Sequence, residues 1–121
     1  MNFYTQLTYA KASFLFSYKN PILLIGSCFV ENIGTRMTDL KFQTDVNPFG
    51  TLYNPASISH ALRRLIQAEL YQEKDLFASG GLFHSFDHHS RFSALTAEAC
   101  LNQINTRLES SARFLRQCQR L

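Results

Sequence analysis

The chain has 121 residues, of which 45% are hydrophobic and 17% charged, and its formal net charge is +3 at pH 7. A chain of this length fits one domain with a modest core. Its net charge rests mainly on arginines of the last third, which are not interleaved with exposed aromatic residues. This pattern indicates a basic helix face and argues against nucleic-acid binding.

No segment is long enough to span a membrane, and no basic stretch followed by an apolar run marks a signal peptide. The three cysteines, Cys28, Cys100 and Cys118, have no C-x-x-C spacing. Neither a disulfide framework nor a structural zinc site is therefore predicted. We expect a cytoplasmic protein with no cofactor, no metal and no membrane partner.

The first predicted strand covers residues 22–26, where four branched aliphatic residues in a row end at a glycine. Such a run is typical of a strand buried on both faces of a parallel sheet. A helix is predicted over about 29–40, because apolar residues recur there at spacings of three and four. These residues are Phe29, Ile33, Met37 and Leu40.

Ser27 lies between this strand and this helix, at the sheet edge where open α/β folds bind their ligands. The unpaired N–H groups and positive dipole end of a helix start favour an anion. Ser27 is therefore a candidate nucleophile whose oxyanion would form beside ready donors. The alternative is that Ser27 only caps the helix, since position 29 is Phe and the full G-x-S-x-G motif is missing. Cys28 is interpreted as a small buried side chain beside the turn.

A second strand is predicted over 42–46, closed by the turn Asn-Pro-Phe-Gly at 47–50. Strand, helix and strand form a βαβ unit. Asn54 and Pro55 predict the start of a second helix that runs to about residue 71. Residues 72–95 are predicted to be a loop, and the last helix runs from a Thr96 cap to about residue 118.

The predicted loop holds a cluster of titratable side chains: His84, Asp87, His88 and His89. On a helix, His84 and His88 would share a face and would bind a divalent metal with Asp87. The neighbouring glycines and phenylalanines favour a loop, so no metal site is predicted. Two interpretations stay open: the histidines bond to backbone groups of a packed loop, or the loop folds over Ser27 and supplies a base.

Three segments together resemble the GSCFA-domain family, which is related to the SGNH/GDSL hydrolases. They are Gly-Ser-Cys-Phe-Val-Glu-Asn-Ile-Gly at 26–34, Asn-Pro-Phe-Gly-Thr-Leu-Tyr-Asn-Pro at 47–55, and His-Ser-Phe-Asp-His-His-Ser-Arg-Phe at 84–92. The resemblance extends from about residue 19 to residue 116, and the three motifs occur in the family's order.

The resemblance implies an α/β fold of the three-layer SGNH (flavodoxin-like) type, with parallel strands and flanking helices. Ser27 matches the family's proposed nucleophile, and Gly50 lies where an oxyanion-donating glycine is expected. The implied activity is that of a serine esterase or acyl hydrolase on a small-molecule or carbohydrate ester. The loop with His84, His88 and His89 would then line the substrate pocket.

One departure from the SGNH pattern limits this expectation. SGNH enzymes carry their base as Asp-x-x-His near the C-terminus, and this sequence has no Asp-x-x-His. Residues 1–121 therefore match the N-terminal portion of one such domain, an incomplete form of the fold without the later strands. We expect this portion to be inactive and to self-associate through an open sheet edge. The alternative is a non-catalytic remnant or binding module.

Overall fold

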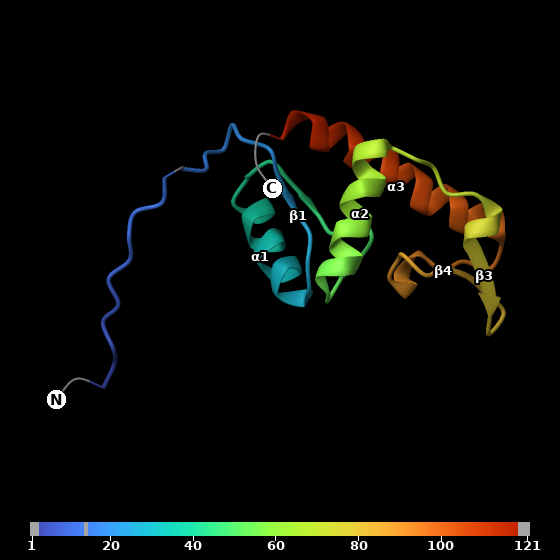
Figure 1. Cartoon of the computed structure of the whole chain (residues 1–121), viewed down its shortest axis with the longest axis horizontal. Helices are drawn as coiled ribbons and strands as arrows, with labels where there is room; N and C mark the ends of the chain where they lie inside the picture. Colours follow the sequence, from blue (N-terminus) through green and yellow to red (C-terminus); the bar gives the residue numbers. More distant parts are fainter. Residues whose placement is uncertain (1–2, 14, 119–121) are drawn as a thin grey trace.

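The computed structural model of this protein describes residues 3–13 and 15–118. The elements in chain order are β1 (Ile22–Leu24), α1 (Cys28–Asp39), β2 (Thr44–Val46), α2 (Pro55–Gln67), the 3₁₀ helix η1 (Glu73–Asp75), β3 (Leu76–Ser79), β4 (Leu82–Ser85), the 3₁₀ helix η2 (Ser90–Phe92) and α3 (Ala97–Gln117). The fold is mixed α/β, and the described strands form two separate two-stranded sheets (Figure 1).

The predicted βαβ unit is confirmed. Strands β1 and β2 pair in parallel, with Ile22 opposite Thr44 and Leu24 opposite Val46, and α1 connects them. Helix α1 approaches β2 closely at Gly34, where an added Cβ would lie 2.5 Å from Cγ2 of Val46. Glycine at this position therefore allows the helix to pack against the strand.

The prediction of a loop over residues 72–95 is wrong. Strands β3 and β4 form an antiparallel hairpin, in which Leu76 lies opposite Ser85 and Ser79 opposite Leu82. Gly80 and Gly81 make its two-residue turn with φ of 58° and 78°. Positive φ at both positions gives the turn whose twist matches the strands. Two glycines between short apolar segments were the hairpin signal in the sequence.

Helix α2 ends earlier than predicted, at Gln67, because Ala68 takes the left-handed conformation with φ 51°. The chain then carries Tyr71 into the interior, where its ring is buried. Asn105 of α3 holds this extended stretch by bonding both backbone groups of Tyr71, at 2.8 Å to the N–H and 3.0 Å to the carbonyl. The last helix begins after Thr96, whose Oγ1 accepts from the N–H of Ala99, as predicted.

The core joins β1, the turn after β2, α2 and α3. Its fully packed members are Leu23, Phe49, Ala61, Leu65, Tyr71, Ile104 and Leu108. Helix α3 is also fixed to β2 by Arg107, which forms an ion pair with the buried carboxylate of Asp45 and donates to the carbonyl of Val46 at 3.1 Å.

Two further observations concern the N-terminal arm and the search for a membrane-spanning helix. Residues 3–13 form an extended arm that points away from the body (Figure 1), and its side chains are exposed. Among residues 3–13 and 15–118, no helix is both long and apolar enough to cross a bilayer.

Candidate functional site

Ser27 lies at the predicted junction, where β1 ends and α1 begins. It occupies the N-cap position of α1 with φ −76° and ψ −172°, and its side chain is half-buried. Its hydroxyl makes no capping hydrogen bond. The side chain therefore does not perform the capping role that its position allows, and its Oγ is left for other chemistry.

The backbone donors around Ser27 are also unused. The first intrahelical bond runs from the N–H of Glu31 to the carbonyl of Ser27, at 3.1 Å. Within the described part of the chain, no group accepts a hydrogen bond from the N–H groups of residues 27–30. Free N–H groups at a helix start are donors for a negatively charged oxygen.

The bend before Ser27 is held by Asn47, which follows β2 and is fully buried. Its Oδ1 accepts from the N–H of Gly26 at 2.8 Å, and its Nδ2 donates to Oε2 of Glu31 at 2.8 Å. Asn47 thus connects the residue before Ser27 with the first turn of α1. Gly26 itself has no room for a side chain, because an added Cβ would lie 2.6 Å from Cγ2 of Val30.

Gly50, the possible oxyanion donor, lies in the turn after β2 with φ 84°. Its N–H donates to the carbonyl of Asn47 at 2.9 Å, so this donor is engaged within its own turn. An added Cβ would overlap the Cβ of His89. The N–H of His89 in turn donates to the carbonyl of Phe49 at 2.9 Å. The histidine-rich loop is therefore packed directly onto the turn that contains Gly50.

Arg91 completes the connection between this loop and the edge that carries Ser27. Its Nη1 lies 2.9 Å from Oε1 of Glu31, and its Nη2 donates to the carbonyl of Asn47 at 3.1 Å. The hydrogen bond from Asn47, followed by the bond and charge of Arg91, lowers the pKa of Glu31 below its usual value despite partial burial. Glu31 is therefore a fixed anion at neutral pH and does not act as a proton donor there.

The four histidines occupy different environments. His84 bonds to Oγ of Ser93 at 2.6 Å and to the carbonyl of Ser79 at 3.0 Å. His88 is bonded to Oγ of Ser85 at 2.9 Å, and its ring lies among Phe49, Tyr71 and Phe92. Burial lowers the pKa of His88 to about 4, so its ring is neutral.

The two remaining histidines face outward. The ring Nδ1 of His89 accepts from the N–H of Arg91 at 3.1 Å. His60 bonds to Oδ2 of Asp87 at 2.9 Å. All four histidines lie within the described residues, and none of them is hydrogen-bonded to Ser27. His84 and His88 also do not share a helix face, because His84 is in β4 and His88 follows it.

No group of three or more histidine, cysteine or acidic side chains suited to a metal ion is present among the described residues. Cys28 differs from its prediction, since it is exposed and not buried beside the turn.

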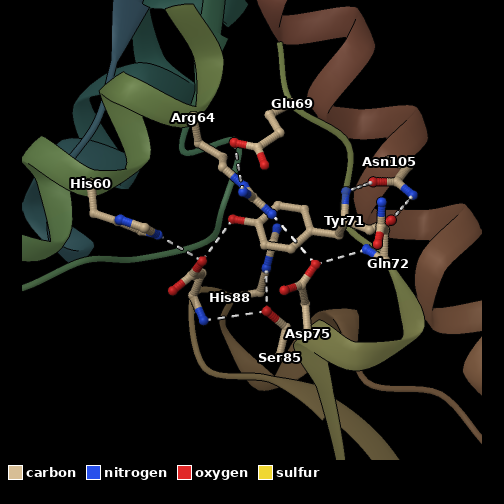
Figure 2. A network of polar contacts seen from close by, with 10 residues as sticks. His60, Arg64, Glu69, Tyr71, Gln72, Asp75, Ser85, His88 and Asn105 are labelled. Atoms are coloured by element: carbon tan, nitrogen blue, oxygen red, sulfur yellow. Dashed lines mark hydrogen bonds and ion pairs between the residues drawn. The ribbon is translucent and has the colours of Figure 1, made fainter. Parts of the chain in front are cut away.

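A second polar cluster lies between α2 and the hairpin (Figure 2). Tyr71 donates to Oδ2 of Asp87 at 2.8 Å, the same oxygen that His60 contacts. Burial and the hydrogen bond to Asp87 raise the pKa of Tyr71 far above its usual value. The pKa of Asp87 is lowered: burial alone would raise it, but the bonds from Tyr71 and His60 outweigh burial.

Arg64 supports this cluster from α2. Its guanidinium lies 4.0 Å from the centre of the Tyr71 ring and pairs with Glu69 at 3.1 Å and with Asp75 at 3.6 Å. Figure 2 shows Arg64 placed over the tyrosine ring with both carboxylates near it. Tyr71 is thereby fixed between a cation and a carboxylate.

Sequence reasoning named Ser27, Gly50 and the histidines but did not find Asn47, Glu31 and Arg91. Asn47 belonged to a segment read only as a turn, and its positive φ of 46° is one that asparagine tolerates. Glu31 stands in the first turn of a predicted helix, where an acidic residue is common. Neither position revealed its partner, because each partner comes from a distant segment.

The comparisons with known proteins agree with the sequence motifs. The GSCFA family matches residues 21–121. Neither the comparison with curated proteins nor the comparison with solved structures gives a match. The family match covers nearly the whole chain, and the chain therefore belongs to the GSCFA family.

Proposed function

We propose that this chain carries the nucleophile of an SGNH-type serine acyl hydrolase, and that Ser27 is this nucleophile. The observation that carries the proposal is that hydrogen-bonding groups at the junction between β1 and α1 are unpaired. The Ser27 hydroxyl makes no capping bond there, and the neighbouring helix N–H groups are unpaired within the described residues. A nucleophile beside preorganised donors is the arrangement that acyl transfer requires.

In this mechanism Oγ of Ser27 attacks the carbonyl carbon of an ester, and the carbonyl oxygen becomes negatively charged. The N–H groups at the start of α1 would hold that oxygen. The C–O bond of the ester then breaks, the alcohol leaves with the proton from Ser27, and water hydrolyses the acyl-serine. The resemblance to SGNH enzymes favours a small-molecule or carbohydrate ester as substrate, within a three-layer α/β fold.

The proton transfer needs a general base, and no histidine is bonded to Ser27. The SGNH pattern assigns this role to Asp-x-x-His, which is missing from these residues. Loss of the base from a serine–histidine pair lowers the rate by several orders of magnitude. We therefore expect slow acylation and little turnover from residues 1–121 alone.

A fluorophosphonate probe tests the nucleophile, because it forms a stable covalent bond to the serine oxygen and does not need deacylation. Without the general base this reaction is slow, so the labelling is followed over a long incubation. We expect labelling at Ser27, identified by peptide mapping, and its loss in Ser27→Ala. Ser59→Ala is the matched control, since Ser59 is an exposed serine in α2. Labelling that is equal in wild type and Ser27→Ala would remove the assignment.

The second candidate is a non-catalytic binding module, and the missing contact between Ser27 and any histidine favours it. Two measurements distinguish the candidates. Aryl acetate hydrolysis by the 121-residue chain that disappears in Ser27→Ala would exclude the binding module. Complete resistance of Ser27 to the fluorophosphonate, with a folded chain, would favour it.

A further inference from the structure

Phe86 is an exposed aromatic ring held in a fixed position. It is 85% exposed, and yet it stacks on Phe77 with 4.1 Å between ring centres and 22° between planes. Phe77 stacks in turn on His84 at 5.2 Å. His84 is itself bonded at both ring nitrogens, to Ser93 and to Ser79. The hairpin therefore presents one rigid aromatic face to solvent.

Two hollows lie beside this ring. One has a volume of about 280 Å³, and the other about 390 Å³. Both are bounded by His60, Phe86 and Asp87, so these three residues separate them. The first hollow extends toward Ser57 at the start of α2, and the second toward Lys74 and Asp75 of η1. Sites for small ligands have volumes of this order.

Polar groups with unused hydrogen-bonding capacity line the hollows: His60 and Asp87 line both of them, and Lys74 and Asp75 line the larger one. Asp87 and Asp75 each use Oδ2 in bonds to the protein. Within the described residues, neither the two Oδ1 atoms nor the Lys74 ammonium nor Nδ1 of His60 forms a hydrogen bond or ion pair with another side chain or with the backbone. Carboxylates accept and an ammonium donates, so together they match hydroxyl groups, which do both.

The charges of the side chains that line the larger hollow balance; Glu69, which pairs with Arg64, lies outside this lining. Asp75 and Asp87 contribute two carboxylates, and Arg64 and Lys74 contribute two cations. A balanced set attracts neither a strong anion nor a strong cation, and it favours a neutral ligand with many hydroxyl groups. An aromatic face beside such groups suits the C–H face of a sugar ring.

From this arrangement we propose that Phe86, with His60, Asp87 and Lys74, forms a binding site for a neutral sugar. One sugar ring packs on the exposed face of Phe86, and its hydroxyl groups bond to the free oxygen of Asp87 and to the Lys74 ammonium. A second ring of the same glycan extends into the other hollow. Tyr71 and His60 keep Asp87 in place through the bonds at 2.8 Å and 2.9 Å. The proposal does not depend on Ser27 being a nucleophile.

An NMR titration of the ¹⁵N-labelled chain with N-acetyl-D-glucosamine, methyl β-D-glucoside and xylobiose tests the site. We expect shifts of the amides around Ser57, Lys74 and Asp87 with at least one sugar. Phe86→Ala should weaken that binding by about tenfold. Phe3→Ala is the matched control, because Phe3 is 92% exposed in the N-terminal arm, and it should bind as wild type does.

A second variant tests the site in the case that Phe86→Ala does not fold. Lys74→Met removes an exposed ammonium that has no ion pair among the described residues, so it should weaken binding while leaving the amide spectrum unchanged. Ser27→Ala should bind sugar normally, which separates this test from that of the nucleophile.

Three results would overturn the proposal. The first is the absence of shifts with all three sugars, and the second is equal affinity of Phe86→Ala and wild type. The third is concentration-dependent broadening around Phe86 without sugar, which would identify the ring as a protein contact.

Discussion

Arg91 and Glu31 form an ion pair at 2.9 Å although 60 residues separate them in the chain. The pair joins η2 to the first turn of α1, four residues after Ser27. Both side chains are partly exposed, at 43% and 34%, and pairs of this kind contribute less than about 1 kcal/mol. The pair therefore orients the loop, while the stability of this edge depends on the buried Asn47 beneath it.

Asn47→Ala is expected to destabilise the fold by about 3 kcal/mol. The change removes the acceptor of the Gly26 N–H and the donor to Glu31, and it places alanine at φ 46°. Urea unfolding followed by circular dichroism measures the effect. Asn32→Ala, at an exposed position of α1, should change the free energy of unfolding by no more than about 0.5 kcal/mol. Similar losses in both variants would contradict the role given to Asn47.

Gly50→Ala is expected to be far more damaging than Gly80→Ala. Both glycines have positive φ, 84° and 58°, so each substitution costs about 1 kcal/mol in backbone strain. A Cβ on Gly50 would also overlap His89, whereas a Cβ on Gly80 would meet nothing within 4 Å. Overlap of this kind adds about 1–3 kcal/mol. The difference between the unfolding free energies of Gly50→Ala and Gly80→Ala measures the packing of His89 on the turn. Equal values for the two variants would contradict this packing.

The junction at Ser27 was predictable because its signals are local. A strand of branched aliphatics, a glycine and a helical spacing all lie within residues 22–40, and the parallel pair with β2 followed from them. The hairpin signal was equally local in Gly80 and Gly81, and it was missed because these glycines were interpreted as part of a loop.

The partners in the site were not predictable in the same way. Tyr71 and Asp87 are 16 residues apart, and His60 and Asp87 are 27 apart. Their contacts depend on where α2 ends and how the hairpin docks against it. No periodicity within a single segment contains that information, because it arises only when separate elements pack together.

Stability is expected to fall as the pH drops from about 6.5 to about 4, and His88 is the main cause. Its pKa is about 4 in the folded chain because burial among aromatic rings disfavours the charged form. In the unfolded chain His88 binds a proton near pH 6.5. Within this pH range the unfolded state therefore binds more protons than the folded state. The free energy of unfolding falls by at most about 3 kcal/mol as a result.

His88→Phe should flatten this pH dependence, because phenylalanine fits an aromatic environment and does not titrate. Urea unfolding at about pH 7 and about pH 4.5 measures the difference. The exposed His89 provides the control, since His89→Asn should retain the wild-type slope. The pKa of Asp87 is also lowered in the folded chain, so protonation of its carboxylate reduces the stability of the fold as well, but at lower pH. An unchanged slope in His88→Phe would assign the effect to other groups.

Self-association is expected through the side of β1 that β2 does not cover. An apolar hollow of about 370 Å³ lies against β1, lined by β1 itself, by Phe16 before it and by side chains of α1 and α2 that include Met37 and Leu62. Apolar surface beside a strand edge favours pairing with another copy. Sedimentation velocity should show oligomers that increase with concentration, and Met37→Lys should reduce them because it places a charge in the hollow.

Ile66→Lys is the matched control for this last prediction. Ile66 is 71% exposed on α2 and does not line the hollow, so the added charge is the same while the hollow stays apolar. If oligomers persist in Met37→Lys and disappear in Ile66→Lys, the contact between copies lies on the outer face of α2 and not at the hollow. A monomer at every concentration, with a sharp cooperative melt, would show that the edge of β1 is adequately covered within one chain.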